Sequence, residues 1–252
     1  MNLNGERLPI KAETKRAIRK EAHYGCAKCG NPIIEYHHIQ PYHEVLCHEV
    51  DNLIALCPTH HYKADRGMIP KQQLYELKKQ PFNSLQDNIK DDLFIGSYGK
   101  LKFKVGATTF MRTPNLFVVD NFPLISIKRD ELDNAVISAK FFDSSSILIA
   151  EIQNNEWITY IKEEIWDVQY NSGKLKINSG RREIFLEFIT NPENNYVELR
   201  ANMYYNNCFF NIMPSKITFG INLKNAKTIR GTTQRATIGN CTEGISLSTH
   251  SL

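Results

Sequence analysis

The spacing of hydrophobic and polar positions predicts helices in the first third of the chain and strands in the rest. Segment 11–22 contains no proline or glycine, and its apolar residues, mostly alanine, suit a helix. A second helix is predicted from Lys71 to Lys79, and a third is expected to begin at Pro58, because proline is favoured in a first helical turn. A strand is predicted from Ile33 to Ile39.

From about residue 95 the pattern is that of β-structure. Short runs rich in β-branched and aromatic residues recur at strand-like spacing, and asparagine pairs such as Asn154-Asn155 and Asn206-Asn207 separate them as turns. The clearest runs are Leu101 to Val105, Ala135 to Phe142, Ser146 to Ile152, Ile165 to Tyr170, Ile184 to Ile189 and Tyr196 to Met203. An antiparallel sandwich or small barrel is predicted, and a β-solenoid is the weaker alternative because no fixed-period repeat is visible.

The change of pattern predicts an α+β protein with two domains. The stretch from Gln80 to Asp92 is polar and carries Pro81 near its head, so we place a linker at 83–94. The N-terminal domain then covers 1–82, and an all-β domain covers 95–252. Aromatic side chains of the β domain are expected to be core more often than binding surface: Trp157, Tyr160, Trp166, Tyr170, Tyr196, Tyr204 and Tyr205.

Composition favours a cytoplasmic protein. The hydrophobic fraction of 42% is enough for a core, and no apolar run approaches the roughly 20 residues of a membrane span. The first ten residues lack the apolar stretch of a secretory signal, which implies a reducing cytosol. The six cysteines are therefore expected to be thiols or metal ligands, and Cys47, Cys208 and Cys241 lack ligand spacing and are expected to be idle thiols.

The distribution of charge is more informative than its sum. A formal net charge of +4 is too small to identify a nucleic-acid-binding protein. Five basic residues nevertheless fall on the first predicted helix, where they could lie along a phosphate backbone or form an ordinary solvated face. They are Lys11, Lys15, Arg16, Arg19 and Lys20.

Metal-binding residue types are concentrated at the N-terminal end, where seven of the eight histidines lie within the first 61 residues. Cys26-x-x-Cys29 and Cys57-x-x-His60 are two pairs with the spacing that lets neighbouring ligands reach one tetrahedral ion. A single Cys-x-x-Cys could also be a redox pair, but two such pairs of thiolates and an imidazole favour Zn²⁺. Four protein ligands would make this zinc structural.

A second group of residues remains once the zinc ligands are assigned. His37 and His38 are adjacent on the predicted strand, so they point to opposite faces unless the strand ends there. His61 follows His60 in a helix, where consecutive side chains point about 100° apart, so one can face the zinc and the other the strand. Asn52 ends the long loop between these elements, and the combination predicts a second site.

The pattern Cys-x-x-Cys, His-His-Ile-x-Pro, Asn-Leu-x-x-Leu-Cys-x-x-His-His resembles the HNH endonucleases over roughly 16–77. That family has a catalytic core of a two-stranded ribbon and a helix around one divalent metal. The resemblance implies that His38 is the general base and that Asn52 orients it or holds the loop. It also implies that His37 and His61 bind the catalytic metal, beside the structural zinc.

The chain departs from the family pattern in two places. The last zinc ligand is usually cysteine in this motif and here is His60. Many members carry aspartate at the position of His37, and an imidazole shifts the preference from Mg²⁺ toward Mn²⁺, Ni²⁺ or Zn²⁺.

The expected function is hydrolysis of DNA phosphodiester bonds. A neutral His38 would take a proton from the attacking water, and the ion held by His37 and His61 would neutralise developing charge, leaving a 5′ phosphate.

The substrate is expected to be double-stranded DNA, with RNA as an alternative, and a double-strand break would require a homodimer or two visits. The β domain would bind DNA, set the oligomeric state, or sense an activating ligand or protein partner, as in restriction or anti-phage defence effectors. The alternative is a non-cleaving zinc module that binds nucleic acid or protein, with the function carried by the β domain.

Overall fold

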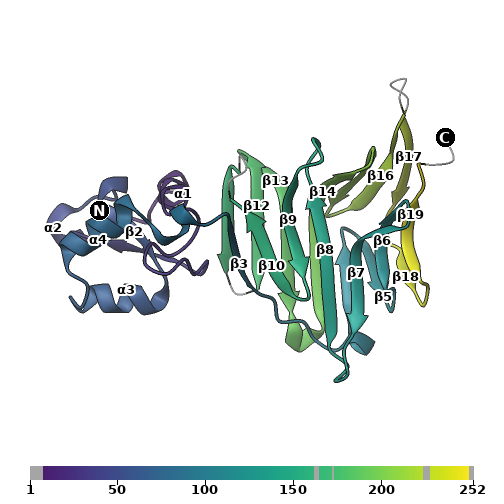
Figure 1. The fold of residues 1–252 in the computed structure, drawn as a ribbon, viewed down its shortest axis with the longest axis horizontal. Helices are drawn as coiled ribbons and strands as arrows, with labels where there is room; N and C mark the ends of the chain where they lie inside the picture. The colour runs from purple at the N-terminus through teal and green to yellow at the C-terminus, as the bar shows by residue number, and fades with distance from the viewer. Residues whose placement is uncertain (1–7, 162–164, 172, 224–227, 250–252) are drawn as a thin grey trace. The chain divides into compact units, whose positions relative to one another are not determined.

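The chain is an α+β protein with few helices and a large β-rich part (Figure 1). The computed structural model describes residues 8–161, 165–171, 173–223 and 228–249. The chain divides into two compact units: the first comprises Met1–Ile89 and Asp167–Asn171, and the second comprises Lys90–Trp166 and Ser172–Leu252. The segment 83–94, which the sequence predicted as a linker, contains most of a 3-10 turn and the third strand.

The first unit is built from short helices around a two-stranded sheet. Its elements are α1 (Ala12–Glu21), β1 (Glu35–His38), α2 (Tyr42–Val45), η1 (Val50–Asn52), β2 (Leu53–Leu56), α3 (Pro58–Asp65), α4 (Lys71–Lys79) and η2 (Phe82–Leu85). α4 has the bounds that the sequence predicted, and α3 begins at Pro58 as expected. The strand predicted over 33–39 is shorter, because β1 starts at Glu35.

Strand β2 joins the two halves of this unit's core. It pairs antiparallel with β1, and all four of its residues are buried. Leu53 and Ala55 pack with Ile18 of α1 and with Ala22, the residue that follows the helix. Ile54 and Leu56 point to the other face, as alternation along a strand requires, and pack with Ile39, Ala64 and Leu74. The central strand therefore positions helices on both of its faces.

The chain also contains a seven-stranded sheet in the order β19-β6-β7-β8-β9-β10-β3 and a ten-stranded sheet that runs in sequence order from β11 to β17, with β4, β5 and β18 attached (Figure 1). Most of these strands belong to the second unit, whereas β11 and the start of β3 belong to the first. The first eight strands are β3 (Asn88–Asp92), β4 (Lys102–Val105), β5 (Thr108–Met111), β6 (Asn115–Val119), β7 (Phe122–Arg129), β8 (Ala135–Phe142), β9 (Leu148–Gln153) and β10 (Glu156–Tyr160). The next five are β11 (Asp167–Asn171), β12 (Lys174–Gly180), β13 (Glu183–Asn191), β14 (Tyr196–Tyr205) and β15 (Cys208–Met213). The last four are β16 (Lys216–Asn222), β17 (Thr228–Thr233), β18 (Thr237–Gly239) and β19 (Glu243–Leu247), and two 3-10 turns, η3 (Tyr98–Lys100) and η4 (Pro192–Asn194), complete the set.

Aromatic side chains connect the two sheets. The ring of Phe117 on β6 lies 4.8 Å from that of Phe210 on β15, and Phe122 on β7 stacks on Tyr205 of β14 at 5.1 Å. Trp157 is fully buried. Neither sheet closes on itself, so the barrel alternative is not what the chain forms.

The asparagine pairs predicted as turns join hairpins. Asn154 and Asn155 have φ values of 50° and 71° between β9 and β10, and Asn206 and Asn207 have φ values of 44° and 63° between β14 and β15. Two successive left-handed residues suit a tight hairpin turn, and asparagine adopts this conformation more readily than most residues. Within the part of the chain that the structure describes, no helix has the length and apolar character needed to span a bilayer.

Candidate functional site

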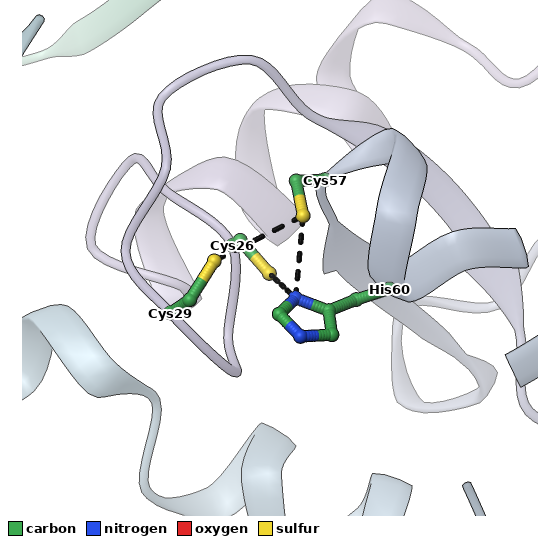
Figure 2. A group of neighbouring side chains, drawn as sticks. All are labelled: Cys26, Cys29, Cys57 and His60. Atoms are coloured by element: carbon green, nitrogen blue, oxygen red, sulfur yellow. Dashed lines mark hydrogen bonds between the residues drawn. The ribbon is translucent and has the colours of Figure 1, made fainter. Parts of the chain in front are cut away.

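Four side chains of the first unit converge as the sequence predicted for zinc, as Figure 2 shows. The Nδ1 atom of His60 lies 3.4 Å from the Cys26 sulfur and 3.2 Å from the Cys57 sulfur, and the Cys29 sulfur lies 3.9 Å from that of Cys57. Ligands about 2.3 Å from a tetrahedral zinc are roughly 3.8 Å apart, so these separations suit one ion. The cluster could hold a metal ion, and its three sulfurs and one nitrogen are a donor set typical of zinc.

Two local structures present these ligands. The main-chain N–H groups of Cys29 and Gly30 both donate to the carbonyl of Cys26, which closes a tight turn. Gly30 has a φ of 77°, and a Cβ atom there would lie 2.4 Å from the Asn83 side chain, so only glycine fits. Cys57 caps α3, which places His60 on its first turn.

Burial acts on the protonation of this cluster. It raises the pKa of the Cys26 thiol to about 12. It also lowers the pKa of His60, with smaller contributions from Lys63 and Lys28. A neutral imidazole is ready to bind a metal, whereas the thiol must lose its proton to the incoming ion, so metal binding and proton release are coupled.

A second cluster joins β1 to α3. His37 Nδ1 lies 3.1 Å from Asp65 Oδ1, and His61 Nδ1 lies 3.2 Å from Asp65 Oδ2. His61 Nδ1 is also 3.3 Å from Glu35 Oε2. Ligand atoms of the first three residues lie within 4.8 Å of one another, which is close enough for one ion.

Asp65 was not predicted from the sequence, although a signal was present. It follows His61 by four residues, and residues four apart share one face of a helix. Burial lowers the pKa of His37, while Asp65 acts in the opposite direction. The net shift favours the neutral imidazole, which is the form that binds metals.

His38 lies apart from the group formed by His37, His61 and Asp65. Its Nε2 is 3.0 Å from Nδ1 of His48, and His48 Nε2 is 2.6 Å from the carbonyl oxygen of Leu8. The Tyr42 ring stacks on that of His48, with centroids 4.9 Å apart. His48 was not predicted from the sequence, because a histidine within a loop has no diagnostic spacing.

Asn52 holds the ends of the long loop together. Its Oδ1 accepts a 2.7 Å hydrogen bond from the Gln40 main-chain N–H, and its Nδ2 donates to the Gln40 carbonyl at 3.0 Å. The Asn52 carbonyl also accepts from the main-chain N–H of Ile39. Of the two roles that the family resemblance implied for Asn52, these contacts correspond to holding the loop.

One cleft of about 850 Å³ is lined both by His38 and by the second cluster. Its lining includes His37, His38, His61, Asp65, Tyr42 and Lys71. The structure therefore brings the three predicted histidines to one cavity, with Asn52 at the base of the loop beside it. His60 belongs to the sulfur cluster instead, so the two adjacent histidines of α3 serve different groups.

The five basic residues of α1 are not equivalent. Lys11 and Lys20 are exposed, and Lys15 and Arg16 are partly buried. Arg19 is only 8% exposed, and its guanidinium binds both carboxylate oxygens of Asp167 at 2.9 and 2.6 Å. Arg19 therefore has no free edge for a phosphate, and four residues remain for the predicted basic face.

Three cysteines lie outside both clusters: Cys208 is buried, and Cys47 and Cys241 are partly exposed.

In comparisons with known proteins, no family model matches the chain, and no curated protein or solved structure matches it.

Proposed function

We propose that the chain is a metal-dependent endonuclease that hydrolyses phosphodiester bonds of DNA, with β1, β2 and α3 of the first unit serving as a ββα nuclease core. One observation carries the proposal: a single cleft is lined by His38 and, separately, by the group His37, His61 and Asp65. A hydrolase of this kind needs a proton acceptor that is not itself a metal ligand. The separation of His38 from the three clustered residues meets that requirement.

The three clustered residues would hold the catalytic ion. Two imidazole nitrogens and one carboxylate leave further coordination positions for water and substrate, and this mixed set suits Mn²⁺ or Ni²⁺ better than Mg²⁺. When bound, the ion would act as a Lewis acid that neutralises charge on a phosphate oxygen. With the ion bound at Nε2 of His61, Glu35, whose Oε2 lies 3.3 Å from His61 Nδ1, would orient that imidazole through its other ring nitrogen.

His38 would act as the general base. Its unprotonated nitrogen takes a proton from a water molecule while the water oxygen bonds to phosphorus. The bond from phosphorus to the 3′ oxygen breaks, and that oxygen takes a proton from solvent. The products are a 5′ phosphate and a 3′ hydroxyl.

Substrate binding would use positive charge on the first unit. Lys71 lines the cleft itself, and Lys11, Lys15, Arg16 and Lys20 form the basic part of α1. Each phosphate that these side chains neutralise releases counterions, so binding is expected to weaken steeply with salt. The zinc cluster would hold the start of α3 and thereby place His61 and Asp65.

The second unit would control where or when cleavage occurs. A nuclease unit followed by a large β unit suits a restriction enzyme or an anti-phage effector whose β unit binds DNA, a ligand or a protein partner. This part of the proposal rests on the arrangement of domains alone.

The deciding experiment is cleavage of supercoiled plasmid by the purified protein with Mg²⁺, Mn²⁺, Ni²⁺ or EDTA. His38→Ala should reduce cleavage by about 10²–10⁴-fold, the usual contribution of a general base. His23→Asn is the matched control, because it removes an imidazole outside the cleft at a left-handed position that asparagine tolerates. Full cleavage by His38→Ala would contradict the proposal, and no cleavage by zinc-loaded wild type with any of the three metals would contradict an unregulated nuclease.

Asp65→Asn tests the metal site separately. The variant keeps the shape of the side chain and loses its charge, so the Mn²⁺ concentration for half-maximal cleavage should rise at least about tenfold, which is the smaller loss seen even for outer-shell partners. Zinc content should stay unchanged, because Asp65 is not part of the sulfur cluster. An unchanged Mn²⁺ dependence would remove Asp65 from the ligand set.

A further inference from the structure

His48 lies between the proposed general base and a main-chain carbonyl. Its two ring nitrogens are both engaged, Nδ1 at 3.0 Å from His38 Nε2 and Nε2 at 2.6 Å from the oxygen of Leu8. The stack on Tyr42 keeps the His48 ring in this orientation. The result is a continuous row of hydrogen bonds from Leu8 through His48 to His38.

The hydrogen positions in this row follow from the chemistry of the groups. A carbonyl oxygen can only accept, so Nε2 of His48 must carry the hydrogen that it donates to Leu8. In a neutral imidazole the other nitrogen then has a lone pair, so His48 Nδ1 accepts. His38 Nε2 must therefore be the donor in their shared bond. In neutral His38 this leaves Nδ1 as the nitrogen that can accept a proton.

We infer that His48 is a positioning residue that holds His38 in the tautomer with a basic Nδ1, an inference that rests on the proposed function for its catalytic meaning. When His38 Nδ1 takes the proton of the attacking water, the resulting imidazolium still donates from Nε2 to the lone pair of His48. His48 thus orients the base, which is the part that the third residue of a catalytic triad plays toward its histidine. No proton needs to pass to His48 itself.

The surrounding fold supports this role. His48 belongs to the loop whose ends Asn52 joins, so its position is set by the two hydrogen bonds between Asn52 and Gln40. The ring of His38 also packs edge-on against Tyr42 at 5.5 Å, which leaves the three rings in mutual contact. The positioning group therefore has its own support, apart from the metal-binding residues.

The test begins with a measurement that needs no catalysis. Histidine-selective ¹⁵N labelling of the zinc-loaded full chain, with signals assigned through single-histidine variants, reports the tautomer of each neutral imidazole. Wild-type protein should show His38 and His48 both protonated at Nε2. His48→Phe keeps a ring to stack on Tyr42 but can neither accept nor donate, so the His38 signal should move toward a mixture of tautomers. A wild-type His38 protonated at Nδ1 would overturn the inference.

Plasmid cleavage with Mn²⁺ supplies the second measurement. His48→Phe should lower kcat by about 10–100-fold, the usual cost of losing a partner that orients an active-site imidazole, with KM within twofold of wild type. His48→Gln retains an acceptor and a donor and should recover most of that loss, which a purely structural role would not predict. Zinc content and melting temperature of both variants show whether the first unit is folded.

The outcomes separate the two proposals. Wild-type kcat in folded His48→Phe overturns the positioning role and leaves the nuclease intact. Absence of cleavage by wild type, together with the expected tautomers, contradicts an unregulated nuclease, and the inference that His48 fixes the tautomer of His38 stands.

Discussion

The two units achieve stability in different ways. The seven largest fully buried side chains, Trp157, Phe103, Phe110, Phe117, Phe141, Phe188 and Phe210, all belong to the second unit. The first unit has two small aliphatic clusters on either face of β2, and Cys26 and Cys57 are themselves members of one of them. Two of the four residues that could hold a metal ion are therefore part of the core of the first unit, whereas large aromatic side chains fill the core of the second.

The largest effect is expected from breaking the metal cluster. Chelation of zinc, or Cys29→Ala, should unfold the first unit, because a structural zinc contributes on the order of 10–16 kcal/mol of binding free energy. Cys29 is exposed, so truncating it removes little packing and tests its role as a ligand. The helical circular dichroism signal should fall, while tryptophan emission stays constant because both tryptophans belong to the second unit.

Cys47→Ala provides the control for this experiment, since Cys47 lies in the same unit and outside the cluster. It should keep full zinc content and an unchanged helical signal. Retention of the helical signal by metal-free wild-type protein would show that the first unit does not depend on the cluster.

The converse experiment removes an aromatic ring from the second unit. Phe117 is fully buried and packs against Phe110 and Phe210, so Phe117→Ala should cost about 3–5 kcal/mol. Urea unfolding followed by tryptophan emission measures the loss, and zinc content should not change. Phe94→Ala, at a side chain that is 73% exposed, should shift the same transition by less than about 0.5 kcal/mol. Equal losses in the two variants would contradict the distinction.

A smaller effect is expected at the loop of the first unit. Asn52→Ala removes two hydrogen bonds to Gln40, each contributing about 0.5–1.5 kcal/mol, so the cost should be about 1–3 kcal/mol. Zinc-dependent helical signal monitored in urea gives the value, and the exposed neighbour variant Asp51→Ala is the control. Cleavage should also decline, because the loop carries His48. Unchanged stability in Asn52→Ala would indicate that the loop is held by other contacts.

The smallest effect is expected from removing the charge of Glu187 in the second unit, and it should depend on pH. Burial acts to raise the pKa of Glu187, but ion pairs with Lys174 at 2.8 Å and Arg200 at 3.0 Å outweigh it, and the net pKa is lowered. A lowered folded-state pKa contributes stability above the unfolded value of about 4.3 and loses it as the pH falls through the folded value. Both cations remain partly exposed, so Glu187→Gln leaves them hydrated and the loss should be small.

Melting of the second unit, followed by tryptophan emission at several pH values between 7 and about 3, tests this difference. The stability gap between wild type and Glu187→Gln should be present at neutral pH and close below the unfolded pKa. The exposed variant Glu193→Gln should follow wild type throughout. A gap of constant size would show that the carboxylate charge is not its source.

The local pattern of the sequence predicted many helices and strands but few of the pairings between strands. The strand Ala135–Phe142 and the helix Lys71–Lys79 were predicted with the bounds that the structure has, because alternation, helical spacing and flanking turn residues are local signals. The parallel pairing of β4 with β14 joins segments nearly a hundred positions apart. The residues of a strand determine that it is a strand but not which neighbouring strand it pairs with. The order of the strands within each sheet could therefore not be predicted from the sequence.

The same distinction applies to the functional residues. Two Cys/His pairs at fixed spacing predicted the sulfur cluster, and Asp65 could have been found from its spacing to His61. His48 could not, because its position depends on a loop conformation and on the carbonyl of Leu8, 40 residues away. The burial of Arg19 was equally hidden, since its partner Asp167 lies 148 residues further along the chain.

Helix α3 also limits how this segment can evolve in length. Within nine residues the helix and its N-cap residue present Cys57 and His60 to one group and His61 and Asp65 to another. A single residue inserted after His60 would rotate everything beyond it by about 100° and shift it by about 1.5 Å, carrying His61 and Asp65 away from β1. Homologous chains that keep both groups should therefore show no insertion or deletion between Cys57 and Asp65, while the hairpin turns of the second unit remain free to vary.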